Sequence, residues 1–226
     1  MKVLAIIPAF NEEESIISTI EEFLAEETGC DYVIIDDGST DSTASICRKR
    51  GYNIICHPAN LGLTGGFQTG IKYAMHNGYD AVIQFDADGQ HIPKFIKPMV
   101  EEMLRSSSDI VIGSRFVNRK KPFSLRMLGS RLISMMIRLT SGKKILDPTS
   151  GMRLFDRKMM EEFEKRYDFG PEPDSIAYLI RLGAKVSEVQ VDMRERIAGE
   201  SYLNLAKSIS YMARTVTSIL LVQWVR

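Results

Sequence analysis

Short apolar runs alternate with helix-like segments along the first half of the chain, and this alternation predicts the fold. The predicted strands are Val3–Ile7, Tyr32–Ile35, Asn53–Cys56, Ala81–Phe85 and Ile110–Ile112. The segments between them predict helices at 15–27, 41–50, 66–77 and 93–104. Continuous apolar strands that alternate with helices form parallel sheets buried on both faces. The sequence therefore predicts an α/β domain with a mainly parallel sheet covered by helices on both faces.

Two basic amphipathic helices are predicted in the second half, at 125–139 and 203–224. The apolar stripe of the first helix consists of Leu128, Leu132, Met135, Met136 and Leu139. Core packing would explain one such helix, whereas two of them favour a surface that lies on anionic lipid. We expect residues 1–204 to form the α/β domain and residues 205–226 an amphipathic, membrane-interfacial helix.

Charge is balanced overall but divided unevenly along the chain. Lys and Arg together number 29, and Asp and Glu together also number 29, so the net charge argues neither for nor against a nucleic acid. We expect no nucleic-acid partner. Between Asp109 and Asp147, however, every charged residue is basic. Such a block indicates an anionic partner such as a phosphate group or an acidic leaflet.

The cysteine count and the chain ends predict the compartment. The three cysteines lack CxxC spacing and fit reduced thiols in a cytoplasmic protein. Met1 leads directly into a strand without a signal peptide, and the apolar run 218–225 is shorter than the roughly 20 residues of a spanning helix. We therefore expect a cytoplasmic protein that is peripheral on the inner face of the plasma membrane.

Two acidic pairs follow predicted strands and indicate a nucleotide–metal site. Asp36-Asp37 ends one strand, and Asp86 and Asp88 follow another. Strand periodicity would direct Asp86 and Asp88 to the same side, as a pair of oxygen ligands that suits Mg²⁺ or Mn²⁺ on a diphosphate. His91, close by, is either a third ligand or a structural histidine.

With these features assembled, the chain resembles the family 2 glycosyltransferases of GT-A fold, in their polyprenyl-phosphate (dolichol-phosphate mannose synthase-like) branch. The resemblance rests on ordered motifs from residue 3 to about residue 204. They are IPAFNEE (7–13), DDGSTDST (36–43), NLGLTGGFQTG (60–70), DADGQH (86–91), GSR (113–115), DPTSGMR (147–153) and ERIAGESY (195–202).

The resemblance implies a role for each candidate residue. Pro8, Phe10, Glu12 and Asp37 would contact the donor nucleotide, and Asp86 and Asp88 would hold the cation. Gln90 would touch the sugar or a phosphate, and Ser201 would add a phosphate hydrogen bond. Arg115 and Arg196 would bind the diphosphate or an acceptor phosphate, for which the forked guanidinium suits two parallel hydrogen bonds.

The implied reaction is inverting, metal-dependent transfer of a sugar from a UDP- or GDP-sugar. We favour a polyprenyl phosphate such as undecaprenyl phosphate as acceptor, because a phosphate with a second pKa of about 6 attacks without a base. A sugar hydroxyl would instead need a general base, for which Glu172 or Asp174 is the candidate. A non-catalytic nucleotide-sugar-binding subunit is the lower alternative. Without a spanning segment, docking would use the amphipathic helices or a small integral-membrane partner.

Overall fold

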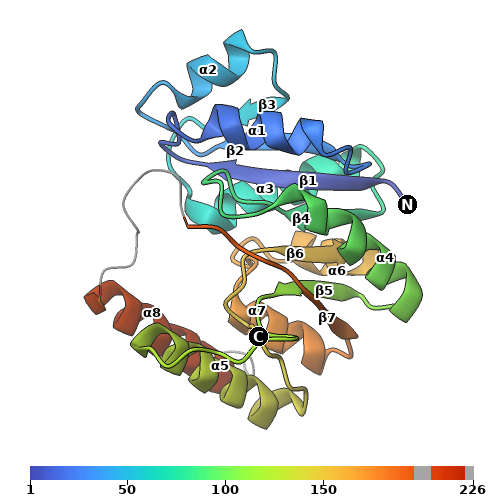
Figure 1. Ribbon diagram of the computed structural model, residues 1–226, viewed down its shortest axis with the longest axis vertical. Coiled ribbons are helices and arrows are strands. Elements are labelled where there is room, and N and C mark those ends of the chain that lie inside the picture. Colours follow the sequence, from blue (N-terminus) through green and yellow to red (C-terminus); the bar gives the residue numbers. More distant parts are fainter. Residues whose placement is uncertain (196–204, 222–226) are drawn as a thin grey trace.

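A seven-stranded sheet runs through the centre of the computed structural model, which describes residues 1–195 and 205–221 (Figure 1). The strands are β1 (Val3–Ala9), β2 (Asp31–Asp36), β3 (Ile54–Cys56), β4 (Ala81–Gln84), β5 (Ile110–Ser114), β6 (Arg153–Asp156) and β7 (Val186–Gln190). Their order in the sheet is β3-β2-β1-β4-β6-β5-β7. Only β6 runs antiparallel to its neighbours β4 and β5. The predicted mainly parallel α/β architecture is confirmed.

Helices cover both faces of this sheet, as its alternating side chains require. The described helices are α1 (Ile16–Ala25), α2 (Thr43–Lys49), α3 (Gly62–His76), the short 3₁₀ helix η1 (Pro93–Phe95), α4 (Ile96–Ser106), α5 (Leu125–Ser141), α6 (Arg157–Glu164), α7 (Pro173–Arg181) and α8 (Leu205–Leu220). On β1, Leu4 and Ile6 pack into one core cluster with α3, α6 and α7. The intervening Ala5 and Ile7 pack into a second cluster with α1 and α4. The two clusters are the two faces of one sheet.

The boundaries of two predicted strands differ in ways that matter for the site. Pro8 follows the predicted strand Val3–Ile7, but in the structure it lies within β1, opposite Ile35 of β2. Proline has no N–H, and the nitrogen of Pro8 faces the side of β4. Because β4 ends at Gln84, opposite Ile6, no residue of β4 stands where an N–H at position 8 would bond, so no hydrogen bond is lost. Because β4 ends there, Asp86 and Asp88 lie in the following turn and the expected strand alternation does not extend to them.

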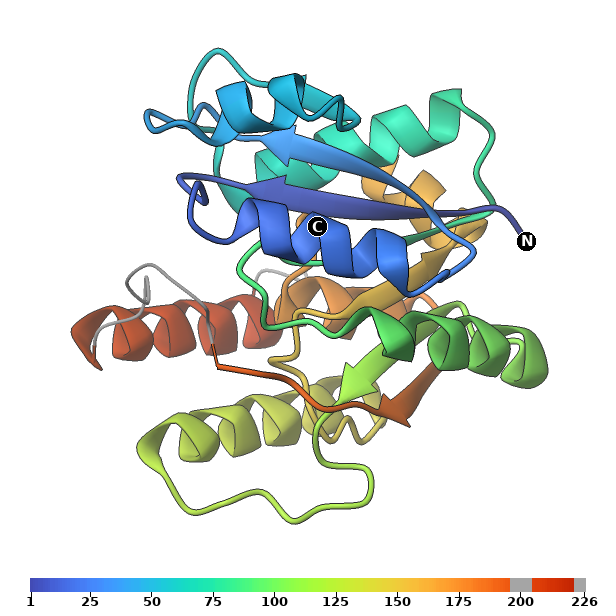
Figure 2. The same cartoon turned by 45° about the horizontal axis from the view of Figure 1, so that its top comes forward.

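Helices α5 and α8 lie side by side at one end of the sheet, against α7 (Figures 1 and 2). The close approach occurs at Gly129 of α5, where a side chain would meet Met212 of α8. The stripe predicted on α5 does not face the core: Leu128, Leu132, Met135 and Leu139 are exposed, and only Met136 is buried. Within the described ranges, no helix is long and apolar enough to span a membrane.

Candidate functional site

The acidic turn after β4 holds its two carboxylates in different ways. The Asp88 side chain is almost fully buried, and its Oδ1 accepts a hydrogen bond from the Gln90 amide at 3.0 Å. Asp86 is partly exposed, and its Oδ1 accepts from Gln84 Nε2 at 2.9 Å. Gly89 makes this turn with a φ of 76°. The turn therefore presents Asp86 toward solvent at the carboxyl edge of the sheet, where α/β folds bind ligands.

His91 hydrogen-bonds to the backbone of Asp86. Its Nδ1 accepts a hydrogen bond from the Asp86 amide at 2.9 Å, which places the ring proton on Nε2. That Nε2 lies 3.5 Å from Asp86 Oδ2, and the ring is buried edge-on against Phe85. Of the two roles considered for His91, this packing fits the structural one. Within the described residues no three His, Cys, Asp or Glu side chains form a metal cluster.

Asp37 and Glu12, both expected at the nucleotide, also make local contacts. Asp37 accepts hydrogen bonds from the amides of Leu61 and Gly62 at 2.9 and 2.7 Å, so it fixes the start of α3. Its Oδ1 also lies 2.8 Å from His57 Nδ1. Glu12 accepts from the Ser15 hydroxyl at 2.6 Å, at the start of α1. Both residues lie at the same sheet edge as Asp86, where a nucleotide-binding role stays a prediction.

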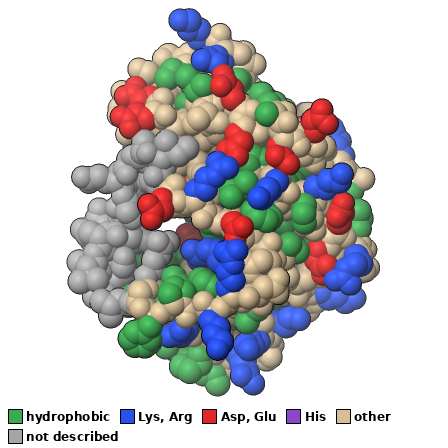
Figure 3. Space-filling model, viewed as in Figure 1, with side chains coloured by type: hydrophobic (Ala, Val, Ile, Leu, Met, Phe, Trp, Pro, Cys, Tyr) green, Lys and Arg blue, Asp and Glu red, His purple; other side chains and the backbone are tan. Residues whose placement is uncertain are grey.

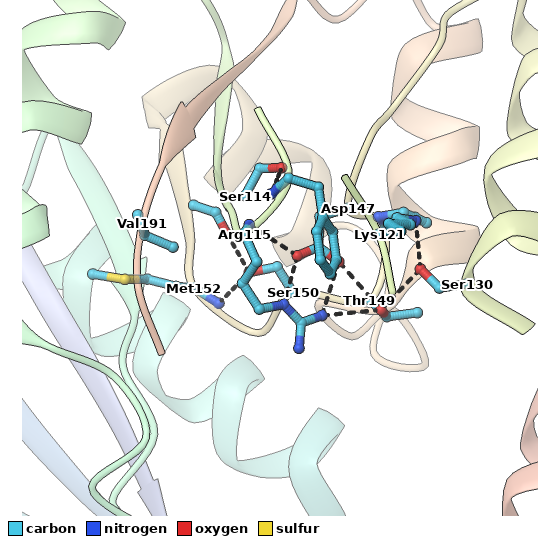
Figure 4. Close-up of polar contacts among 12 residues, drawn as sticks. Ser114, Arg115, Lys121, Ser130, Asp147, Thr149, Ser150, Met152 and Val191 are labelled. Carbon is cyan, nitrogen blue, oxygen red and sulfur yellow. Dashed lines mark hydrogen bonds and ion pairs between the residues drawn. The ribbon is translucent and has the colours of Figure 1, made fainter. Parts of the chain in front are cut away.

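Arg115, in the turn after β5, is held by a fully buried carboxylate (Figure 4). Arg115 Nε and Nη2 donate to Asp147 Oδ2 and Oδ1 at 2.7 and 2.9 Å, and the Arg115 amide donates to Oδ2 at 3.1 Å. Burial alone would raise the pKa of Asp147, but the hydrogen bonds and charge of Arg115 outweigh it and lower that pKa. The pair aims the guanidinium and leaves its Nη1 directed away from Asp147.

A second cation, Lys121, lies beside this pair. Its Nζ donates to the Ser130 hydroxyl of α5 at 2.9 Å, and Ser130 Oγ lies 3.3 Å from Thr149 Oγ1. Burial lowers the pKa of the Lys121 ammonium, although the charge of Asp147 opposes the shift. Arg115, Lys121 and Ser130 thus form a cationic, hydroxyl-bearing cluster, which we call the anion site (Figure 4).

The segment 147–153 connects the anion site to the acidic turn. At its start Asp147 holds Arg115. At Gly151, an added Cβ would lie 2.8 Å from Asp86 Oδ2 and 3.3 Å from the His91 ring. At its end, the buried Arg153 donates to the carbonyl of Pro148 at 2.7 Å and to that of Pro171. This segment therefore sets the spacing between the acidic turn and the anion site.

Sequence reasoning missed the roles of Asp147, Lys121 and Ser130. One signal was present: Asp147 is the first acidic residue after the long basic block, within the DPTSGMR motif. A single acidic residue that follows a run of basic residues is a candidate to form an ion pair with one of them and hold its side chain in place. Lys121 and Ser130 carry no comparable signal, because their meeting depends on how α5 packs.

Glu172 and Asp174, the candidate general bases, are hydrogen-bonded to α8. Glu172 occupies the N-cap position of α7 without a side-chain capping bond, and it accepts from the Tyr211 hydroxyl at 2.6 Å. Asp174 accepts from the Ser218 hydroxyl at 2.6 Å. Burial and the charge of Glu172 raise the pKa of Tyr211, so the phenol stays a hydrogen-bond donor. These contacts fasten α8 to the domain through the two carboxylates.

The remaining candidates differ in how far the structure places them. Pro8, Phe10 and Gln90 are half-buried at the carboxyl edge, in β1, after β1 and in the acidic turn respectively. Arg196 and Ser201 lie outside the described residues.

Comparison with known proteins identifies the family. Residues 4–163 match the model of glycosyl transferase family 2. The chain is 29% identical over 217 residues to the undecaprenyl-phosphate mannosyltransferase of Micrococcus luteus, across 90% of this chain and 88% of the relative. It is 30% identical over 214 residues to the UDP-N-acetylglucosamine–dolichyl-phosphate N-acetylglucosaminyltransferase of Methanococcus voltae, across 84% of each.

The fold is similar to that of glucosyl-3-phosphoglycerate synthase from Mycobacterium tuberculosis, crystallised with Mn²⁺, UDP and glucosyl-3-phosphoglycerate. The TM-score is 0.67 at 19% identity, across 98% of this chain and 79% of the synthase. That likeness concerns the fold alone, whereas the family match covers most of the sequence. The chain is a glycosyltransferase and belongs to glycosyl transferase family 2.

Proposed function

We propose that this glycosyltransferase moves a sugar, with inversion, from a nucleotide-diphosphate donor to a polyprenyl phosphate at the inner face of the cell membrane. The observation that carries the proposal is the anion site of Arg115, Lys121 and Ser130, which the segment 147–151 connects to Asp86. A phosphate monoester has the charge and the acceptor oxygens that this site would bind. The named relatives act on undecaprenyl and dolichyl phosphates.

The acceptor's own chemistry removes the need for a general base. A phosphate with a second pKa of about 6 is mostly dianionic at neutral pH and is already a nucleophile. In this mechanism Arg115 Nη1 and Lys121 Nζ hold the phosphate in line with the anomeric carbon, and the buried Ser130 hydroxyl positions Lys121. Glu172 and Asp174 remain hydrogen-bonded to Tyr211 and Ser218, which agrees with a structural use of these carboxylates.

The acidic turn fits a divalent cation that is shared with the donor diphosphate. Mg²⁺ and Mn²⁺ accept carboxylate oxygens, and Mg²⁺ commonly takes one or two carboxylates with the rest of its shell from phosphates and water. Asp86 and Asp88 would supply those carboxylates, since both follow β4 at the carboxyl edge of the sheet. When bound, the cation would neutralise charge on the departing diphosphate.

The donor is a UDP- or GDP-sugar. The Methanococcus voltae relative is named for a UDP-sugar, which supports UDP as the first donor to test.

The exposed face of α5 supports action at a membrane. Leu128, Leu132, Met135 and Leu139 form an exposed row, and Phe123 before the helix is 92% exposed. Arg131 and Arg138 flank the row, and no acidic residue occurs from 110 to 146. Hydrophobic and basic side chains gather over this end of the molecule (Figure 3). An apolar row with basic flanks suits an anionic leaflet, where nucleotide sugars from the cytoplasm meet lipid phosphates.

A transfer assay tests the proposal. Purified protein, Mn²⁺ and undecaprenyl phosphate in detergent would be incubated with radiolabelled UDP- and GDP-sugars, and label in the organic phase would be counted. We expect one donor to label the lipid and Asp88→Asn to abolish labelling. Donor consumption without lipid labelling would overturn the lipid acceptor, and no donor consumption at all would favour the binding-subunit alternative.

Transfer to a sugar hydroxyl is the second candidate, and one observation favours it. Glu172 and Asp174 line a cavity of about 660 Å³ between α7 and α8, together with Thr64, Asp168, Tyr211 and Ser218. Carboxylates and hydroxyls are groups that bind sugars, and either acid could take a hydroxyl proton. Glu172→Gln separates the candidates: a loss of about 10²-fold or more in kcat indicates a base, whereas a lipid-phosphate acceptor predicts a smaller effect.

A further inference from the structure

The anion site is backed by two side chains of β7 that have no role in the mechanism above. Glu188 and Gln190 are two residues apart on β7 and hydrogen-bond to two different loops. Glu188 Oε2 and Oε1 accept from the amides of Leu146 and Asp147 at 2.7 and 2.9 Å. Gln190 Oε1 accepts from the Asn118 amide at 2.8 Å, and Gln190 Nε2 donates to the Arg115 carbonyl at 3.1 Å. Alternate residues of one strand thus hold both loops of the site.

We propose that Glu188 is a positioning residue for the acceptor phosphate, acting through Asp147 on Arg115. This inference rests on the proposed function and adds to it the residue that fixes the anion site. The path is short: the Glu188 carboxylate holds the Asp147 amide, and the Asp147 carboxylate holds the Arg115 guanidinium and amide. A shift of the 146–147 backbone would therefore turn the guanidinium that binds the phosphate.

A carboxylate is the group that this position requires. Two neighbouring N–H groups point at Glu188, and each of its oxygens accepts one of them. An amide of the same shape would accept with its oxygen and place its NH₂ group against the other N–H. Burial raises the pKa of Glu188, so holding the charge here costs free energy, which the two N–H groups and the Ser114 hydroxyl partly offset.

The test compares Glu188→Gln with a matched control, Glu161→Gln on α6, whose side chain is about half exposed. Initial rates would be measured against undecaprenyl phosphate in detergent and, separately, against the donor. We expect Glu188→Gln to raise the KM for the lipid phosphate about tenfold, with the donor KM unchanged and kcat within about twofold. The control should match the unaltered protein in every constant.

A double-mutant cycle shows whether Glu188 acts through Asp147. If Glu188 acts through Asp147, then Glu188→Gln should raise the acceptor KM far less in the Asp147→Asn background than it does in the unaltered protein. Full additivity, an unchanged acceptor KM, or an equal loss against both substrates would each overturn the positioning role. If the unaltered protein fails to label lipid, the proposed function fails and the inference fails with it. If it labels lipid and Glu188→Gln behaves like the control, only the inference fails.

Discussion

Gly151→Ala offers the sharpest test of how the 147–153 segment supports the acidic turn. The added Cβ would lie 2.8 Å from Asp86 Oδ2 and 3.3 Å from the Cε1 and Nε2 atoms of His91. Carbon and oxygen atoms that are not bonded need roughly 3.3 Å, so the Asp86 carboxylate must move by about 0.5 Å. Gly151 has no positive φ, so this crowding, rather than backbone strain, is the perturbation.

Two hydrogen bonds restrain how the displaced Asp86 carboxylate can move. Asp86 Oδ1 is held by Gln84 at 2.9 Å, and the Asp86 amide is held by His91. Metal sites lose about 10- to 100-fold in affinity when the groups that orient a ligand are disturbed, and about 0.5 Å is already the tolerance of such sites. We expect Gly151→Ala to weaken Mn²⁺ binding by that factor, measured from the free Mn²⁺ signal in electron paramagnetic resonance with UDP present.

A matched glycine separates this effect from a general cost of added bulk. At Gly66, in α3, a new Cβ would make ordinary contacts of 3.7 and 3.8 Å with Pro8 and Ile35. Gly66→Ala should leave Mn²⁺ affinity unchanged and stabilise α3 slightly. Circular dichroism would confirm that both variants are folded. Mn²⁺ affinity within twofold of the unaltered protein in folded Gly151→Ala would refute the reasoning about Asp86.

Three further outcomes follow from the contacts. Leu132→Glu should reduce sedimentation with anionic vesicles by about tenfold, since a charge replaces an exposed apolar contact of α5; unchanged sedimentation would exclude this face as the docking surface. Tyr211→Phe should lower the free energy of unfolding by about 1–2 kcal/mol, in urea denaturation, because Glu172 loses its hydroxyl partner; no change would mean that this contact does not hold α8. Arg115 lowers the pKa of Asp147 below its ordinary value of 3.8. The stability that this ion pair adds to the folded protein is therefore complete above pH 3.8 and is lost as the pH falls through the lower pKa of the folded state. In thermal unfolding, an Asp147→Asn variant should lack this acid-dependent loss of stability.

The strands and helices of the first half could be predicted from the sequence, whereas in the second half the helices α5 and α8 were predicted but the strands β6 and β7 were not. Strands such as β1 and β2 are continuous apolar runs between loop residues, so their side chains alone mark them. By contrast, β6 begins at Arg153 and runs antiparallel between β4 and β5. The positions of β6 and β7 in the sheet depend on neighbouring strands that are distant in sequence. No local sequence pattern specifies those neighbours.

The candidate site divides in the same way. Asp86 and Asp88 were predicted because strand ends in a parallel sheet gather at one edge, and that rule needs only the order of elements. The contacts of Glu172 and Asp174 with α8 could not be predicted, because they depend on where a helix about forty residues later docks. The direction of the α5 stripe was also undecided, since an apolar row looks the same in sequence whether it meets a core or a membrane.

The sequence by itself determined the α/β architecture, the family and the acidic turn, because local periodicity and ordered motifs specify them. Only the tertiary structure decided that Asp147 aims Arg115, that Lys121 meets Ser130, and that Glu188 holds the loop behind them. The physical reason is that a hydrogen bond between distant residues depends on backbone positions fixed by the packing of the whole domain. Composition and spacing contain the participants, but not the distances between them.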